Sequence, residues 1–173
     1  DMTASAAIRT CHASPIGVSN TIAVIKSRSA SRIATPAIDA VIHFAAFKAV
    51  GESSAYPLQY FRNNLGGQIN LMQACDQFGI RNLVFSSSCT VYGNPQVIPV
   101  TEESPLLEPE SPYGRTKAVG EAMLRDWVKS TIPQDGKARQ VIALRYFNPV
   151  GAHPSARIGE CTVGVPDNLI PYI

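Results

Sequence analysis

The sequence lacks the features that mark several large classes of protein. No apolar run in its 173 residues approaches the ~18 residues that a membrane-spanning helix needs. The formal net charge is only +2, which gives no electrostatic basis for binding nucleic acid. With 45% hydrophobic and 16% charged residues, the composition excludes collagen-like and wholly disordered chains. The length and composition therefore predict one ordinary globular domain.

Metal-ligand patterns and redox pairs are also missing. The four cysteines, Cys11, Cys75, Cys89 and Cys161, never lie within three residues of one another, so no CxxC motif is present. The three histidines are equally scattered, and no ligand spacing typical of zinc occurs. Free thiols in a reducing compartment are the simplest interpretation, which predicts a cytoplasmic protein without a metal site.

Acidic residues are almost absent from the first 38 positions. Four basic side chains stand there against Asp1 alone, a balance of +3, whereas residues 39–173 hold 11 basic and 12 acidic residues, a balance of −1. A short apolar run at residues 21–25 indicates a strand, and a connector rich in Ser and Arg follows it. The segment also resembles a transit peptide, and sequence foreign to the fold is a third interpretation. We predict that residues 1–38 are an unmatched, irregular segment before a folded portion at residues 39–173.

From residue 39 onward, strand-like and helix-like segments alternate. Three short runs predict strands, and the first of them, at residues 40–46, is nearly continuously apolar, as is typical of a strand buried on both faces of a sheet. These runs span residues 40–46, 82–88 and 140–146. Apolar residues three and four apart predict a helix over residues 57–79, and Ser111-Pro112 begins a second helix that ends near Lys129. Because strands joined by such helices form right-handed βαβ crossovers, the pattern predicts an α/β fold with a parallel sheet.

Three polar residues form a candidate proton-transfer site at the carboxyl ends of these strands, where parallel sheets bind ligands. Tyr113 and Lys117 are four residues apart near the start of the second helix, so they share one helix face. A neighbouring ammonium and the positive helix end would lower the pKa of Tyr113 from its ordinary ~10. Ser88, just past a strand, would hold the substrate oxygen with its hydroxyl. Together the three residues would serve an alcohol or a ketone.

The spacing alone leaves a structural interpretation open. A tyrosine and a lysine four residues apart also fit a solvated helix face, and residues 86–88 could simply end a strand. The context favours the site, because Tyr113 follows Ser111-Pro112 and Ser88 precedes it by 25 residues at a strand end.

Five stretches, in this order, resemble the extended short-chain dehydrogenase/reductase family and, within it, the UDP-glucose 4-epimerases. They are residues 41–53 (VIHFAAFKAVGES), 85–93 (FSSSCTVYG), 111–117 (SPYGRTK), 145–155 (RYFNPVGAHPS) and 164–173 (GVPDNLIPYI). The resemblance covers residues 37–173. It implies an incomplete Rossmann-type doubly wound parallel sheet with flanking helices. It also implies an NAD-dependent isomerase of galactose metabolism, which interconverts UDP-galactose and UDP-glucose through an NAD-bound 4-keto sugar.

The resemblance also implies roles for individual residues. Tyr113 would remove and return the O4 proton, Lys117 would hold the nicotinamide ribose and depress the pKa of Tyr113, and Ser88 would bind O4. Ser88, Tyr113 and Lys117 would therefore touch the cofactor as well. The further cofactor-binding residues would be Phe44, Ala45, Ala46, Phe47, Lys48, Asn63 and Phe147. The UDP-sugar would contact Lys48, Ser88, Cys89, Thr90, Tyr113, Asn148, Asn168 and Leu169.

The chain departs from the family pattern in two large respects. The family opens with a glycine-rich strand–turn–helix that receives the NAD pyrophosphate, followed by an acidic residue for the adenosine ribose. Residues 1–38 contain neither feature, and the family continues past residue 173 into a second lobe that completes the sugar pocket. We therefore expect a central fragment that is inactive by itself. Smaller departures are Ala46, Cys89 and Asp167, where Gly, Ala and Asn are usual.

Two other functions remain open on the same fold. A nucleotide-sugar 4,6-dehydratase would carry an Asp-Glu pair after the threonine at the strand end, but Val91 and Tyr92 follow Thr90 here. A catalytically silent binding or interaction module is favoured for this chain by the missing glycine-rich motif. The resemblance also implies a homodimer through the helices at residues 57–79 and 112–129, with UDP-sugars as ligands and neither nucleic acid nor membrane as a partner.

Overall fold

The computed structural model describes residues 22–26, 38–130, 138–149 and 155. In chain order, the elements are β1 (Ile22–Lys26), β2 (Ile38–His43), α1 (Val50–Ala55), α2 (Pro57–Tyr60), a π-helical segment η1 (Phe61–Leu65), α3 (Gly66–Gln77), β3 (Asn82–Ser88), a short 3-10 helix η2 (Cys89–Tyr92), α4 (Pro112–Lys129) and β4 (Gln140–Tyr146). The predicted helix over residues 57–79 corresponds to α2, η1 and α3 in succession, and the predicted second helix is α4.

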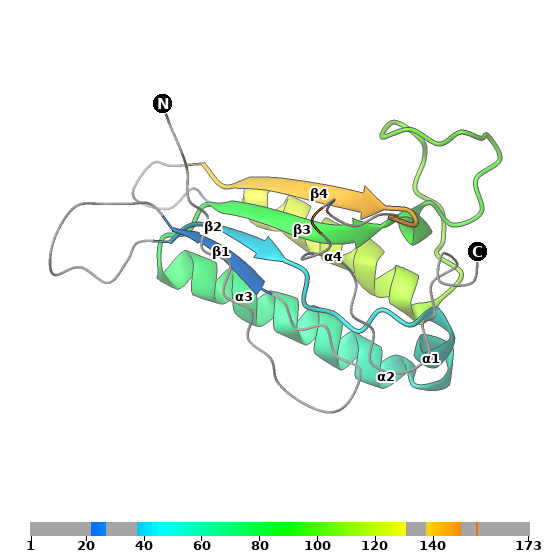
Figure 1. The fold of residues 1–173 in the computed structure, drawn as a ribbon, viewed down its shortest axis with the longest axis horizontal. Helices are drawn as coiled ribbons and strands as arrows, with labels where there is room; N and C mark the ends of the chain where they lie inside the picture. The colour runs from blue at the N-terminus through cyan, green and yellow to red at the C-terminus, as the bar shows by residue number, and fades with distance from the viewer. Residues whose placement is uncertain (1–21, 27–37, 131–137, 150–154, 156–173) are drawn as a thin grey trace, which may run out of the picture.

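The four strands form one sheet in the order β1-β2-β3-β4 (Figure 1). Strands β2, β3 and β4 are parallel, with Ala40 opposite Asn82 and Ser88 opposite Tyr146. This confirms the predicted α/β class and parallel sheet. Strand β1 forms one residue later than the apolar run indicated, and it pairs antiparallel with β2 at the edge of the sheet. The carboxyl ends of β2, β3 and β4 therefore lie at one edge.

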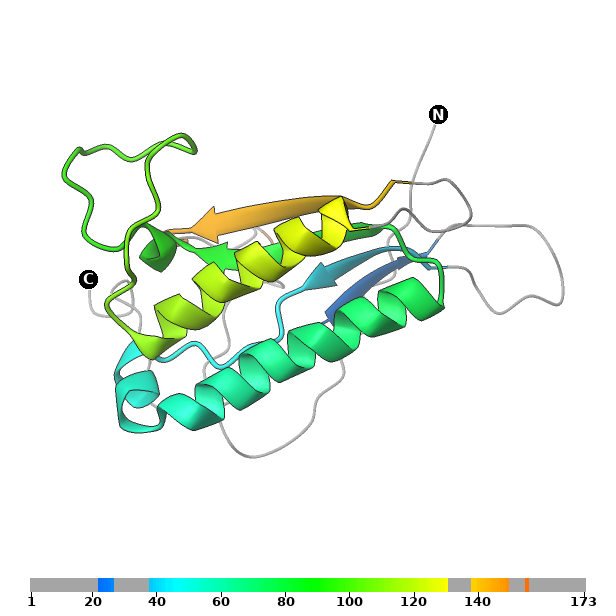
Figure 2. The same cartoon turned by 180° about the vertical axis from the view of Figure 1, so that it is seen from behind.

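Helices α3 and α4 cover the same face of the sheet (Figures 1 and 2). Each joins two neighbouring parallel strands, and successive right-handed crossovers in one direction place their helices on one side. The core between the sheet and these helices is formed by Val41, Cys75, Ile80, Leu83, Phe85, Leu124 and Trp127. Among the described residues, α3 and α4 therefore form one helical layer against the parallel strands.

The opposite face of the sheet is partly open at β4. Ile142 is 59% exposed and Leu144 is 38% exposed. The reason is that, within the described ranges, both long helices pack on the other face and β4 is an edge strand. Within those same ranges, no helix combines the length and the apolarity needed to cross a bilayer.

The start of α4 is fixed by a cap and by a close approach to η2. The Ser111 hydroxyl accepts a hydrogen bond from the Gly114 amide at 3.1 Å, and Pro112 occupies the first turn, as predicted. A Cβ atom on Gly114 would lie only 2.9 Å from Pro109 Cβ and 3.2 Å from Thr90 Cβ. The absence of a side chain at residue 114 therefore lets the first turn of α4 lie directly against η2.

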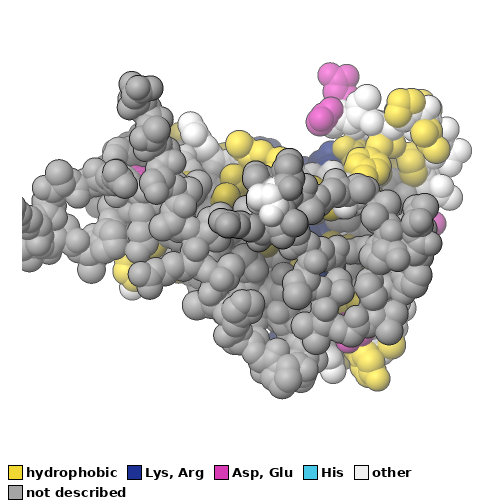
Figure 3. All heavy atoms as spheres, in the orientation of Figure 1, with side chains coloured by type: hydrophobic (Ala, Val, Ile, Leu, Met, Phe, Trp, Pro, Cys, Tyr) yellow, Lys and Arg dark blue, Asp and Glu magenta, His cyan; other side chains and the backbone are white. Residues whose placement is uncertain are grey.

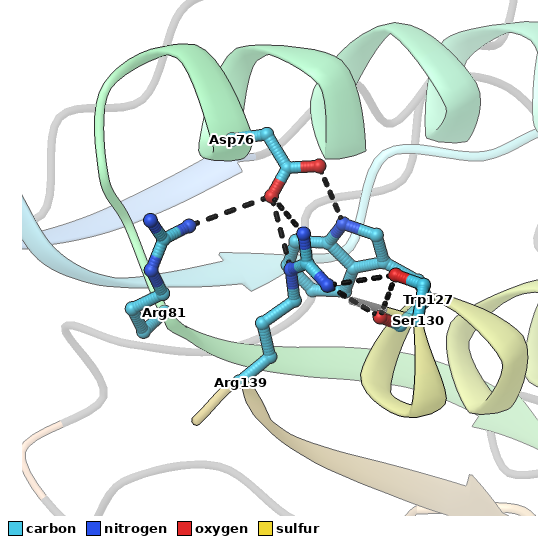
Figure 4. A network of polar contacts seen from close by, with 5 residues as sticks. All are labelled: Asp76, Arg81, Trp127, Ser130 and Arg139. Atoms are coloured by element: carbon cyan, nitrogen blue, oxygen red, sulfur yellow. Dashed lines mark hydrogen bonds and ion pairs between the residues drawn. The ribbon is translucent and has the colours of Figure 1, made fainter. Parts of the chain in front are cut away.

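The end of α4 is held by five polar or aromatic residues, which we call the Asp76 cluster (Figure 4). Asp76 Oδ1 accepts hydrogen bonds from Arg139 Nε at 3.0 Å and Arg81 Nη1 at 3.4 Å. Asp76 Oδ2 accepts one from Trp127 Nε1 at 2.9 Å. Arg139 Nη1 donates to the Trp127 carbonyl and to Ser130 Oγ, both at 2.8 Å. The cluster ties the ends of α3 and α4 to the start of β4 at the amino edge of the sheet.

A loop between η2 and α4 projects from the body of the molecule (green, upper right in Figure 1). The sequence predicted a surface loop here from its four prolines and four glutamates between residues 93 and 111. Val97 and Ile98 are largely exposed on it, and hydrophobic side chains gather in this region of the surface (Figure 3).

Candidate active site

The carboxyl end of β3 and the first turns of α4 enclose the candidate site. Strand β3 ends at Ser88, whose side chain caps η2 by accepting hydrogen bonds from the Thr90 amide at 3.2 Å and from Thr90 Oγ1 at 3.0 Å. Because its oxygen already accepts these two bonds, the Ser88 hydroxyl has its own hydrogen left to donate. Tyr113 and Lys117 face this strand end from one side of α4, as their spacing predicted.

These three side chains line one cleft of about 460 Å³. The other residues around it are Phe44, Ala46, Lys48, Ser86, Ser87, Tyr146, Phe147 and Pro149. The structure thus brings Ser88, Tyr113 and Lys117 together with residues from β2, β4 and the segments that follow them. All lie at the carboxyl edge of the parallel strands, where this class of sheet binds its ligands.

Lys117 is the buried cation of the site. Its side chain crosses to β3, where Nζ donates a hydrogen bond to the Ser86 carbonyl at 2.8 Å. The same nitrogen lies 5.0 Å from the Phe85 ring centroid and 5.7 Å from the Tyr113 ring centroid. Burial lowers the pKa of Lys117 to about 8. The ammonium form still predominates at neutral pH, but the pKa lies much closer to neutral pH than that of an ordinary lysine.

Tyr113 does not have the lowered pKa that the sequence predicted. Burial raises the pKa of its phenol, the hydrogen bond with Ser88 lowers it, and the charge of Cys89 raises it, with a net shift upward. Lys117 contributes less than expected because its ammonium donates to the Ser86 carbonyl and lies over the face of the tyrosine ring. In this structure, Ser88 is therefore the group that stabilises the phenolate.

His43 is a buried imidazole beside the site. Its ring centroid lies 5.9 Å from that of Phe85, and burial, with a smaller effect of the charge on Lys117, lowers its pKa to about 4. Its Nδ1 atom has no hydrogen-bond partner among the described residues. His43 is therefore neutral at physiological pH, and an apolar and aromatic environment keeps it so.

The loop after β2 is fixed by Asn64, a residue that the sequence analysis missed. Asn64 Oδ1 accepts hydrogen bonds from the Phe47 amide at 2.8 Å and from Asn63 Nδ2 at 2.9 Å. Its Nδ2 donates to the Phe47 carbonyl and to Thr116 Oγ1, both at 3.1 Å. This buried amide thus joins the loop to η1 and α4. The only sequence signal was its position beside Asn63, because its partners are 17 and 52 residues away.

The remaining predicted site residues are distributed unevenly. Phe44, Ala46, Lys48 and Phe147 line the cleft, whereas Phe47 and Asn63 line a second, open hollow of about 720 Å³ beside η1 and α3. Ala45 lies in the loop after β2, Cys89 and Thr90 begin η2, and Asn148 is exposed after β4, but none of these four lines the cleft. Asn168 and Leu169 lie outside the described residues.

Four residues line the cleft although the sequence did not single them out: Ser86, Ser87, Tyr146 and Pro149. Ser86 contributes its backbone carbonyl, which no side-chain pattern reveals, and Tyr146 and Pro149 adjoin predicted residues. Within the described part of the chain, no three His, Cys, Asp or Glu side chains are arranged to hold a metal ion.

Comparison with known proteins decides the family. The model of the NAD dependent epimerase/dehydratase family matches residues 9–163. The chain belongs to this family. The match begins inside the segment 1–38, so the boundary that we placed at residue 38 stays a prediction.

Named relatives and solved structures agree with this assignment. UDP-glucose 4-epimerase 2 of Arabidopsis thaliana is 53% identical over 135 residues, which cover 78% of this chain and 37% of that protein. UDP-glucose 4-epimerase of Bacillus subtilis is 52% identical over 136 residues, 79% of this chain and 38% of the relative. The chain therefore spans little more than a third of the length of the relatives it matches.

The solved structures extend the likeness to the fold. A UDP-glucose 4-epimerase from Stenotrophomonas maltophila, with bound NAD and formylated UDP-arabinopyranose, matches with a TM-score of 0.71 at 52% identity over 79% of this chain and 39% of that chain. One from Bifidobacterium longum, in complex with NAD+ and UDP, matches with a TM-score of 0.71 at 45% identity over 78% and 39%. The resemblance to the epimerases and the Rossmann-type sheet are confirmed.

Proposed function

We propose that the protein to which these residues belong is a UDP-glucose 4-epimerase, which interconverts UDP-galactose and UDP-glucose through a 4-keto sugar with NAD as cofactor. The observation that carries this proposal is the cleft at the carboxyl edge of the sheet, in which Ser88, Tyr113 and Lys117 come together. Membership of the epimerase family and about 50% identity to several UDP-glucose 4-epimerases support it.

The residues around the cleft fit a dinucleotide. An open volume of about 460 Å³ lies beside the buried Lys117, and a loop whose backbone is fixed by Asn64 borders it. Phe44, Ala46 and Lys48 from that loop, with Lys117 and Phe147, would hold the cofactor. When bound, NAD supplies the site that accepts a hydride from the sugar and returns it.

The chain's own residues would carry the proton. Tyr113, in its phenolate form, would take the proton from the O4 hydroxyl and, as the phenol, give it back, and Ser88 would hold the same oxygen by a hydrogen bond. Lys117 would keep positive charge beside the phenol and anchor α4 to β3 through the Ser86 carbonyl. Thr90 would keep the Ser88 side chain in place, because both its amide and its hydroxyl donate to Ser88 Oγ.

Two assays on the 173-residue chain test the proposal in steps. NAD binding, followed by the fluorescence of a reduced dinucleotide, separates a cofactor-binding protein from a catalytically silent module. Turnover of UDP-galactose with added NAD is then measured beside Tyr113→Phe. We expect no turnover by the chain alone, since it corresponds to little more than a third of its relatives. Turnover that persists in Tyr113→Phe would contradict the role of Tyr113.

We also propose that the protein is a cytoplasmic homodimer, with the helices at residues 57–79 and 112–129 at the interface. The exposed apolar side chains Ile69 on α3 and Val119 and Val128 on α4 support such an interface. The free thiols of Cys75 and Cys89 support a reducing compartment. Light scattering should give twice the chain mass, and Val119→Asp should give the monomer. A monomer at micromolar concentration before substitution would rule the dimer out.

A further inference from the structure

Helix α4 is joined to strand β3 by two successive polar contacts. Lys117 Nζ donates to the Ser86 carbonyl at 2.8 Å, and Ser87 Oγ donates to Glu121 Oε1 at 2.5 Å. Glu121 follows Lys117 by one helical turn, while Ser87 follows Ser86 in the strand. The two contacts therefore join Lys117 and Glu121, one helical turn apart, to the consecutive strand residues that directly precede Ser88.

Strand β4 completes this arrangement through Arg145. Its Nε donates to Glu121 Oε1 at 2.9 Å and its Nη2 donates to Glu121 Oε2 at 2.7 Å, so the pair is bidentate. Arg145 lies opposite Ser87 in the β3–β4 register. Its Nη1 donates to Tyr92 Oη at 3.0 Å, which adds η2 to the same set of contacts. We call these four residues, Ser87, Tyr92, Glu121 and Arg145, the Glu121 brace.

At the centre of the Glu121 brace, Glu121 and Arg145 form an ion pair in the interior of the protein. The Glu121 side chain is only 4% exposed and that of Arg145 is 20% exposed. Burial would raise the pKa of Glu121, but the hydrogen bonds from Arg145 and Ser87 outweigh it and hold that pKa below its usual value. The carboxylate is therefore charged at neutral pH. Because a buried pair gains little or nothing over apolar side chains of the same volume, stability alone does not account for its presence.

We propose that Glu121 is a positioning residue: paired with Arg145, it fixes the end of β3 against α4 so that the Ser88 hydroxyl meets the Tyr113 phenol. This inference rests on the proposed function, because that function gives the alignment of Ser88 with Tyr113 its purpose. Glu121 acts through Ser87 and does not line the cleft. Ser88 is the next residue after Ser87, so any shift of β3 along or away from α4 moves the hydroxyl that Tyr113 depends on.

The test is the ionisation of Tyr113, measured by NMR on the chain labelled with carbon-13 at tyrosine Cζ. The six tyrosines give six signals, and Tyr113→Phe identifies the relevant one. Glu121→Asp keeps the charge but shortens the reach, and Glu121→Gln keeps the reach but removes the charge. Because each weakens the hydrogen bond from Ser88, we expect both to raise the pKa of Tyr113, by up to about one unit, as Ser88→Ala does.

The direction of the shift in the pKa of Tyr113 distinguishes positioning from a direct electrostatic effect. If Glu121 acted on Tyr113 only through its charge, Glu121→Gln would leave Arg145 unbalanced and lower the pKa of Tyr113, and Glu121→Asp would leave it unchanged. Either result would overturn the proposal. In the Ser88→Ala background, adding Glu121→Gln should cause no further rise, since the path runs through Ser88. An additive rise would equally contradict it.

A matched variant in the Asp76 cluster, at the carboxyl end of α4, controls for general loosening. Asp76→Asn weakens the Asp76 cluster but should leave the pKa of Tyr113 unchanged, with circular dichroism confirming the fold at each pH. If Glu121→Gln fails to fold, Arg145→Lys, which keeps the charge but loses the bidentate geometry, carries the same expectation. The readout needs neither NAD nor turnover. Absence of the predicted pKa shifts would overturn the positioning role alone, whereas the proposed function is tested separately, by turnover of UDP-galactose with and without Tyr113→Phe.

Discussion

The two ends of β4 are each tied to a helix by an arginine and a carboxylate, but in very different surroundings. At the amino edge of the sheet, Arg139 meets Asp76, and their side chains are 8% and 39% exposed. Near the carboxyl edge, Arg145 meets Glu121, and their side chains are 20% and 4% exposed. A pair with an accessible carboxylate keeps part of its hydration and contributes less, whereas a pair with a buried carboxylate is costly to desolvate and still more costly to leave half-made. The buried pair is the one next to the candidate site.

This difference distinguishes contacts that stabilise the fold from contacts that position the candidate site. The Asp76 cluster joins three elements where no cleft residue lies, and water can replace part of it. The Glu121 brace joins α4, β3, β4 and η2, and its strand residue, Ser87, directly precedes Ser88. Its partners must all be present for the buried charges to be tolerated. We therefore expect the two ends to respond differently to substitution and to pH.

Breaking the buried pair should have the largest effect. Arg145→Ala leaves the Glu121 carboxylate buried with Ser87 as its remaining described hydrogen-bond donor, and we expect a loss of about 3–5 kcal/mol in the free energy of unfolding. Urea denaturation, followed by circular dichroism, measures it. A loss below about 1 kcal/mol would mean that the pair is effectively solvated and that the two ends are alike.

Acid should act on the cleft end through His43. The folded-state pKa is about 4, below the ordinary 6.5, so the unfolded chain binds a proton more readily between these values. Stability should therefore fall as the pH drops from 6.5 toward 4, by up to about 3 kcal/mol, and be unaffected by this group above 6.5. His43→Asn should flatten this part of the stability profile. An unchanged slope in that variant would show that His43 is not the group responsible.

Gly120, the residue before Glu121, offers a test of how tightly α4 packs against α3. A Cβ atom on Gly120 would lie 2.6 Å from Gln68 Oε1 and 3.0 Å from Phe85 Cζ. Gly120→Ala should therefore cost about 1–3 kcal/mol of unfolding free energy through overpacking. Gly51→Ala is the matched control, because a Cβ there meets nothing within 4 Å. Equal melting temperatures for the two variants would argue against a tight contact between α3 and α4.

The exposed end should show the smallest effect. Asp76→Asn keeps the shape and one acceptor oxygen while removing the charge, so we expect a loss of about 1 kcal/mol or less. Added salt should weaken the wild-type cluster in the same direction, since the pair is accessible to ions. A loss as large as that of Glu121→Gln in the same denaturation assay would remove the distinction between the ends.

Local pattern was enough for the strands, for the two long helical segments and for the grouping of Ser88, Tyr113 and Lys117. The Ser111-Pro112 cap, the four-residue spacing of Tyr113 and Lys117, and the strand end at Ser88 are all short-range features. Glu121, Arg145 and Asn64 were missed because their long-range contacts join residues 17 to 53 positions apart.

The direction of the Tyr113 pKa shift was predicted wrongly for a related reason. Spacing places Lys117 beside the phenol, but only the fold shows that burial dominates and that the ammonium donates to the Ser86 carbonyl. Likewise, the apolar run at residues 140–146 could not show that β4 would be an edge strand with Ile142 exposed.

A graft would test whether this cleft is an epimerase active site. Residues 39–149 of the chain would replace the matching stretch of the Bacillus subtilis UDP-glucose 4-epimerase, and conversion of UDP-galactose to UDP-glucose would be measured with and without Tyr113→Phe. We predict turnover by the graft and a loss of at least about 100-fold in Tyr113→Phe, the usual contribution of a general acid–base group. A folded graft that binds NAD but shows no turnover, or turnover that survives Tyr113→Phe, would contradict the account.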